Sequence, residues 1–157
     1  MKKIIFMLIG FGIILTSCQN NAHVSNSVVT SDIEDIFYQN LNSDIGYCDV
    51  SEYYRDNYFS DVLNIEECKI YTSNDSTNFD EFGIFRFTNE GDARRASDTI
   101  KNYLNNSKYE FENGIIYNIQ EYPKFQNADV KIYGKYLIYT ILLPEKSEKI
   151  YDEIDLL

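Results

Sequence analysis

Histidine is almost absent from the sequence, which argues against the enzyme classes that depend on an imidazole. The 157 residues include one histidine, His23, in a polar segment near the N-terminus. Serine and cysteine hydrolases need a histidine beside the nucleophile to accept its proton, and zinc hydrolases use histidine as a metal ligand. We therefore expect no catalytic residue and no metal site of these kinds.

Glycine-rich phosphate loops are missing, and basic residues are scarce. The chain has 14 lysines and arginines against 25 aspartates and glutamates, for a net charge of −11. Nucleic acids are bound by clustered basic side chains, and the only adjacent basic pair beyond the first three residues is Arg94 and Arg95. These absences argue against a nucleotide-binding P-loop and against nucleic acid as a partner, and we expect no cofactor.

The apolar run at residues 4–15 is too short to span a bilayer, which takes about 20 residues. It follows two lysines and leads into Leu-Thr-Ser-Cys at residues 15–18. A basic start, a short apolar run and small residues before a cysteine are typical of a lipoprotein signal peptide. We predict that residues 1–17 are this peptide and that Cys18 is lipidated after cleavage. An ordinary signal peptide or an uncleaved anchor is the alternative.

A diacylglyceryl group on Cys18 would anchor the protein to the extracytoplasmic face of the cell membrane. One acyl chain binds a bilayer only marginally, so a diacyl anchor holds more firmly. Residues 18–30 are polar and lack a clear period, and we interpret them as the lipidated cysteine and a flexible tether. The length of residues 31–157 suits a single domain.

Two further cysteines, Cys48 and Cys68, lack the Cys-x-x-Cys spacing of redox or metal pairs. Outside the cytosol such a pair can persist as a disulfide. The sequence therefore allows a Cys48–Cys68 disulfide, and two free thiols are the alternative.

Apolar periodicity predicts the first secondary-structure elements. A stripe of apolar side chains over residues 33–41 indicates a helix. Residues 51–67 contain two cap-like sequences, which predict one or two short helical turns. Residues 69–72 and 82–88 are predicted strands, the second with apolar side chains on both of its faces.

The second half of the sequence contains the clearest helix, which begins at Asn89 or Asp92 and should end or kink at residues 105–107. Residues 130–133 and 136–143 are predicted to form a hairpin around Gly134. Between these two features, Pro123 predicts an extended or turn backbone for the residue before it.

The last predicted element is a helix that has Pro144 in its first turn. The order of the elements indicates an α+β fold. We expect an antiparallel sheet of about four strands in ββα-ββα order, with helices packed on one face and an N-terminal helix preceding it.

The acidic loop at residues 74–81 does not match an EF-hand. Counted from Asn74, the sixth position is Phe79 rather than glycine, and the twelfth is Phe85 rather than glutamate. A solvated turn is the better interpretation, with a looser calcium site as the alternative. Pairs of carboxylates could also act on glycans, but with 25 acidic residues some pair will always lie close together.

Four segments together resemble a known family: residues 83–87, 93–104, 122–128 and 130–136. They are similar to the bacterial lipoprotein family called "domain of unknown function 4358", which occurs mainly in Firmicutes. The resemblance covers roughly residues 31–155. It implies a lipidated N-terminus, a strand leading into an amphipathic helix and a late hairpin, and it implies no activity, cofactor or catalytic residue.

These patterns favour a non-catalytic binding or interaction module of the cell envelope over an enzyme. Its partner would be an envelope protein or a wall component, and its hypothetical contact patch is Tyr53, Tyr54, Tyr58 and Phe59. The alternatives are a carboxylate-dependent enzyme acting on cell-wall glycan and a solute-binding accessory of a transporter.

Overall fold

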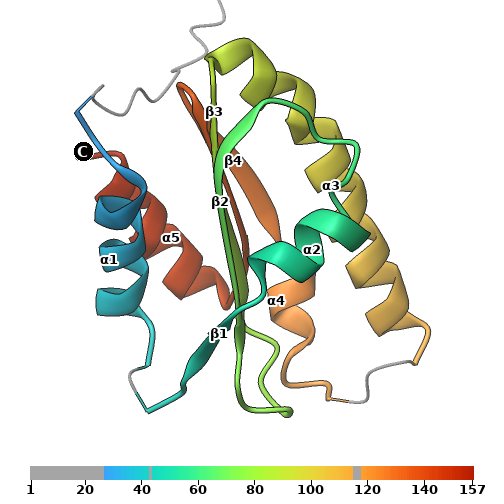
Figure 1. Ribbon diagram of the computed structural model, residues 1–157. Coiled ribbons are helices and arrows are strands. Elements are labelled where there is room, and N and C mark those ends of the chain that lie inside the picture. The colour runs from blue at the N-terminus through green and yellow to red at the C-terminus, as the bar shows by residue number, and fades with distance from the viewer. Residues whose placement is uncertain (1–26, 43, 115–117) are drawn as a thin grey trace, which may run out of the picture.

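The computed structural model describes residues 27–42, 44–114 and 118–157 (Figure 1). Its strands form one antiparallel sheet in the order β1-β2-β3-β5-β4. The strands are β1 (Tyr47–Asp49), β2 (Ile65–Ser73), β3 (Glu81–Phe87), β4 (Asp129–Tyr133) and β5 (Tyr136–Ile141), and the helices are α1 (Thr30–Asn40), α2 (Ser51–Asn57), α3 (Glu90–Glu112), α4 (Tyr122–Gln126) and α5 (Pro144–Ile154). The α+β class and the N-terminal helix are confirmed. The fifth strand is β1, whose three residues are too few to show an alternating pattern.

Helices cover both faces of the sheet, so the prediction that they pack on one face is wrong. Figure 1 shows α1 and α5 on one side and α2, α3 and α4 on the other, and each side has its own buried cluster. The reason is that β3 and β5 are buried along almost their whole length. Near-continuous apolar strands require cover on both faces.

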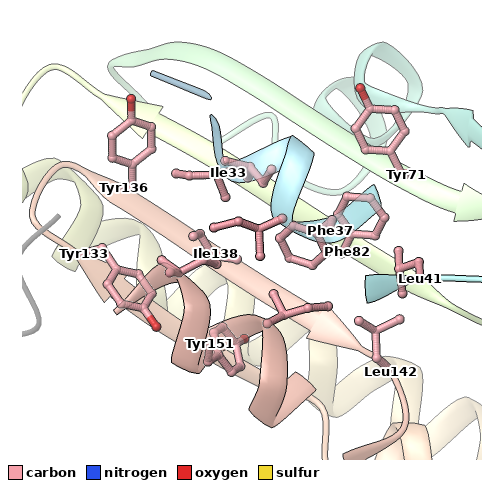
Figure 2. Close-up of a cluster of buried hydrophobic side chains, with 14 of the residues drawn as sticks. Ile33, Phe37, Leu41, Tyr71, Phe82, Tyr133, Tyr136, Ile138, Leu142 and Tyr151 are labelled. Carbon is pink, nitrogen blue, oxygen red and sulfur yellow. The ribbon is translucent and has the colours of Figure 1, made fainter. Parts of the chain in front are cut away.

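The face beneath α1 and α5 is held by stacked aromatic rings (Figure 2). Phe37 of α1 stacks on Phe82 of β3 with ring centroids 4.1 Å apart, and Tyr71 of β2 stacks on the same ring at 5.1 Å. Phe82 and Ile84 point to this face, whereas Phe85 and Phe87 point to the other. The predicted alternation of the second strand is therefore confirmed.

Strand β2 begins at Ile65, where the sequence suggested a helical cap. Asn64 has a positive φ of 61°, a conformation that asparagine adopts more readily than most residues. Its side chain donates a hydrogen bond to Asp92, 2.9 Å away. Asn64 thus turns the chain into the strand rather than starting a helix.

Helix α3 begins as predicted, but it does not end at residues 105–107. The Asn89 side chain caps it by accepting a hydrogen bond from the backbone N–H of Asp92. The helix continues to Glu112 because its apolar stripe continues. Phe111, seven residues after Leu104, is buried and stacks on Phe125 of α4 with centroids 4.6 Å apart.

The hairpin and the last helix match their predictions. Tyr133 and Tyr136 are paired across a turn in which Gly134 has a φ of 59°, and α5 begins at Pro144. The prediction for the residue before Pro123 is wrong, because Tyr122 and Pro123 form the first turn of α4. A proline is tolerated there, since the first turn of a helix leaves its N–H groups unbonded.

The folded domain includes the last residues assigned to the tether. Val28 and Thr30 are buried, and the Val28 carbonyl accepts a hydrogen bond from the Tyr136 hydroxyl at 3.0 Å. The predicted signal peptide, Cys18 and the tether up to residue 26 lie outside the described residues. Within the described ranges, none of the helices has the length and apolar character needed to cross a membrane.

Candidate functional site

A cleft of about 390 Å³ opens on the sheet face that carries α2 and α3. Its walls come from α2 and the residue after it, from the second half of α3, and from the loop between β2 and β3, which lies at the lower end of the molecule in Figure 1. Small-molecule sites in proteins usually measure about 300–1,000 Å³. The cleft is therefore large enough for a ligand.

The floor of the cleft contains a buried carboxyl group held by three tyrosine hydroxyls. Glu81, the first residue of β3, is 7% exposed. Its Oε1 accepts hydrogen bonds from Tyr103 and Tyr139, both at 2.8 Å, and its Oε2 accepts one from Tyr54 at 3.0 Å. These bonds join α2, α3 and β5 to β3 at one point, so the position of the cleft walls is fixed by this carboxyl group.

Burial raises the pKa of Glu81, and the three hydroxyl groups only partly counter it. Burial and the neighbouring Glu81 charge likewise raise the pKa values of Tyr54 and Tyr103, so both hydroxyls keep their protons and act as donors at neutral pH.

The raised pKa of Glu81 predicts a specific dependence of stability on pH. Because the folded state holds the Glu81 proton more tightly than the unfolded state, stability should fall as pH rises from about 4.3, the usual glutamate value, through the folded pKa. Glu81→Gln should remove this contribution and flatten the curve above about pH 4.3. Urea unfolding of both proteins between pH 4 and 8 would measure it, and parallel curves would contradict the prediction.

Three tyrosines form an aromatic wall along the cleft. The ring of Tyr58 lies 5.0 Å from that of Tyr54 and 5.3 Å from that of Tyr103. Tyr53 is 59% exposed and Tyr58 is 47% exposed, whereas Phe59 is fully buried against Tyr103. The predicted contact patch is therefore corrected: Tyr54 and Tyr58 line the cleft, Tyr53 lies outside its lining, and Phe59 is a core residue because the α2–β2 connection folds it inward.

A second polar network lies beside Glu81. Asp80 has a fully buried side chain, and its Oδ1 is 2.5 Å from the Nζ of Lys124 on α4. Lys124 also pairs with Glu121 and donates a hydrogen bond to Asn78. Lys146 of α5 approaches the other Asp80 oxygen at 3.4 Å. The network ties α4 and α5 to the loop that forms one wall of the cleft.

The acidic loop at residues 74–81 is held partly by its own side chains, and its last two residues, Asp80 and Glu81, are buried rather than solvated. The Asp75 carboxylate accepts bonds from the backbone N–H and the hydroxyl of Thr77, both at 2.8 Å, an arrangement known as an Asx turn. No group of three potential ligands is placed to hold a metal ion within the residues that the structure describes.

Cys48 and Cys68 are both free, so the structure does not contain the disulfide that the sequence allowed. Cys48 pairs across the sheet with Thr72, four residues along β2 from Cys68. Four residues of strand span about 13 Å, and a disulfide joins Cα atoms no more than about 7 Å apart. Burial raises the pKa of Cys68 to about 12, which keeps that thiol protonated.

Sequence reasoning missed the residues at the centre of the site, namely Asp80, Glu81, Tyr103 and Lys124. One signal was available: Asp80 directly precedes β3 and Glu81 begins it, while the other side chains of that strand are mostly apolar. A pair of carboxylates at the end of a buried strand is unusual, because a buried charge needs a partner. The partners come from α2, α3, α4 and β5, which only the fold brings together.

A family model described as "Domain of unknown function (DUF4358)" matches residues 51–142, more than half of the chain. The matched segment includes every residue that lines the cleft. No curated protein and no solved structure matches the chain. The chain therefore belongs to the family described as Domain of unknown function (DUF4358).

Proposed function

We propose that the protein is a bacterial lipoprotein, anchored by a diacylglyceryl group on Cys18 at the extracytoplasmic face of the cell membrane, and that its domain is a non-catalytic binding module of the cell envelope. The observation that carries the proposal of binding is the ligand-sized cleft, with its tyrosine wall fixed to the buried Glu81. A preformed cleft of this kind is the usual form of a ligand site.

The arrangement of the domain suits such an anchor. The described chain begins with the segment before α1, drawn in blue at the upper left of Figure 1, whereas the β2–β3 loop at the rim of the cleft lies at the lower end. A domain held at its upper end would leave the cleft open to the surroundings. Residues 18–26 could reach at most about 30 Å from the bilayer when fully extended.

Binding is favoured over glycan hydrolysis because both acids at the floor already have partners. A glycosidase needs one carboxyl group as acid and a second one as base or nucleophile. Asp80 is held in an ion pair with Lys124, and Glu81 is enclosed by three tyrosines. Neither carboxyl group is free to activate a water molecule.

The anchor is tested by growing cells that express the protein with an alkyne-bearing fatty acid. We expect the native chain to incorporate the label and to fractionate with membranes. Cys18→Ala should lose both properties, while Cys48→Ala, the matched control for an exposed cysteine, should keep them. Labelling of Cys18→Ala, or no labelling of the native chain, would refute lipidation at Cys18.

The binding role is tested by photocrosslinking on intact cells, with the label placed at Tyr53 beside the cleft. We expect the native protein to capture one envelope component, and Tyr58→Leu to reduce the capture severalfold because Tyr58 lines the cleft. Tyr38→Leu, which alters a half-exposed tyrosine of α1 on the opposite face, is the control. Release of soluble fragments from purified wall glycan by the native protein would instead show that it is an enzyme.

A further inference from the structure

We infer that the cleft binds an organic cation, a ligand that presents an ammonium or guanidinium group to the tyrosine wall and to the carboxylates around it. This inference rests on the proposed function, because it takes the cleft to be the binding site, and it adds the chemical class of the ligand.

The charge of the lining is the first argument. Four acidic residues line the cleft, Asp75, Asp80, Glu81 and Glu110, and no lysine, arginine or histidine is among its described lining residues. Lys124 lies nearby, but its ammonium group is already shared between Asp80 and Glu121. The same ion pair neutralises Asp80, and burial raises the pKa of Glu81, which favours its protonated form. The charge that a ligand meets therefore comes chiefly from Asp75 and Glu110. An anionic ligand would meet like charge there, whereas a cation would meet charge of opposite sign.

The aromatic wall is the second argument, and it is independent of the first. The hydroxyls of Tyr54 and Tyr103 are bonded to Glu81, so these residues offer a ligand their rings rather than their polar ends. Tyrosine rings attract ammonium and guanidinium groups through the negative potential of their faces. The three rings pack against one another, and Tyr58, which is 47% exposed, is the ring of this wall most open to a ligand.

Glu110 places a charge beside this wall. It is an exposed residue of α3 that lines the cleft together with Tyr58. Burial and the charges of neighbouring groups, Glu110 among them, raise the pKa of Tyr58, which agrees with the closeness of the two side chains. A cation against the Tyr58 ring would therefore also lie within the field of the Glu110 carboxylate.

The same chemistry could come from a free amine or from a lysine or arginine side chain of an envelope polymer. The probes must therefore distinguish the effect of the ligand's charge from that of its shape. They must also distinguish a free amine from a side chain that is attached to a polymer. Suitable probes are n-butylamine, agmatine and Nα-acetyl-lysine amide. Each is compared with an uncharged counterpart: n-butanol, N,N′-diacetylputrescine and the Nε-acetylated form of the lysine amide, respectively. N-acetylglucosamine oligomers represent neutral wall glycan.

Each probe is titrated into the detergent-extracted full-length protein, and binding is followed by tyrosine fluorescence. The chain has 14 tyrosines and no tryptophan, so no tryptophan emission hides the tyrosine signal. We expect saturable binding of the cations that weakens with added salt, and binding at least tenfold weaker for n-butanol and the Nε-acetylated lysine amide. Tyr58→Leu and Glu110→Gln should each weaken binding of the cations about three- to tenfold. Preference for the lysine amide over the free amines would identify an attached side chain as the source.

Two control variants make the result specific. Asp98→Asn removes one exposed negative charge from α3 outside the cleft lining, and Tyr38→Leu removes one half-exposed ring from α1; both should bind like the native protein. Equal binding of n-butanol and n-butylamine, or an equal effect of Asp98→Asn and Glu110→Gln, would overturn the inference. Binding of the glycan oligomers alone would show that the ligand is not a cation, while the cleft would remain a binding site. Unchanged capture on cells by Tyr58→Leu would refute the proposed function itself.

Discussion

Replacing Lys124 by methionine should lower the free energy of unfolding by about 3–5 kcal/mol, the usual cost of removing one partner from a buried ion pair. The side chains of Asp80 and Lys124 are 0% and 4% exposed. Without the ammonium group, Asp80 keeps three weaker or more distant partners: the hydroxyl of Tyr47 at 3.1 Å, Lys146 at 3.4 Å and the side-chain amide of Asn78 at 3.5 Å. Urea unfolding at pH 7 measures the difference.

Lys149→Met is the matched control, because it removes the same charge from an exposed pair. Lys149 is 65% exposed and lies 4.0 Å from Glu153, so its loss should change stability by less than about 0.5 kcal/mol. Lys124→Met combined with Asp80→Asn should recover part of the loss, since no unpaired charge would then remain. Equal effects of Lys124→Met and Lys149→Met would show that the buried pair contributes no more to the free energy of unfolding than an exposed pair.

The Asp80–Lys124 pair also makes the stability of the protein depend on pH in the acidic range. Burial alone would raise the pKa of Asp80, but the hydrogen bond and the positive charge of Lys124, with Lys146 beside it, hold that pKa below its usual value. A lowered folded pKa means that the stabilisation is present above about pH 4 and is lost as pH falls through the folded value. Lys124→Met, which lacks this stabilisation at every pH, should show a smaller fall on acidification.

Lys124 should also affect ligand binding, because it holds the β2–β3 loop that forms one wall of the cleft. Glu121, its second partner, accepts a hydrogen bond from the backbone N–H of Phe79 at 2.9 Å, and Lys124 itself bonds to Asn78. Asn78 and Phe79 both line the cleft. Loss of Lys124 should therefore weaken ligand binding as well as the fold.

The sequence predicted those parts of the fold that depend on neighbours along the chain. The stripe of α1, the cap of α3 at Asn89 and the Gly134 hairpin each follow from residues a few positions apart. The errors came where distant residues decide: α3 continues past Asn105 because Phe111 packs on Phe125 of α4. That contact joins segments with no shared pattern in the sequence.

The two-sided packing of the sheet could have been predicted, whereas the site could not. Strand β5 is apolar at nearly every position, a pattern that indicates burial on both faces. In contrast, the partners of Glu81 lie 27 residues before it and 22 and 58 residues after it. Among 25 acidic residues, the only local mark of Glu81 is its place at the start of an apolar strand, and nothing local shows that three tyrosines surround it.

Replacing Gly83 by alanine should destabilise the protein by about 3 kcal/mol, at the upper end of the usual cost of overpacking a core. Gly83 is paired with Tyr139 on the neighbouring strand β5. A Cβ atom at position 83 would lie 2.1 Å from Cε1 of the Tyr139 ring, which is far inside van der Waals contact. Glycine is required here because the tyrosine ring lies across the backbone of β3.

The Tyr139 ring cannot move aside without loss elsewhere, and this makes the expected effect large. Its hydroxyl is bonded to Glu81, and its ring contacts Tyr103 and Phe59 at centroid distances of 6.0 and 6.3 Å. Gly46→Ala is the control, because the atom its Cβ would meet is the end of the exposed Asn74 side chain; it should change stability by less than about 0.5 kcal/mol. If Gly83→Ala is no more damaging than Gly46→Ala in urea unfolding, Tyr139 is not fixed as described. If Gly83→Ala is the more damaging change and adding Tyr139→Leu relieves part of its loss of stability, then Gly83 is what allows the Tyr139 ring to reach the floor of the cleft.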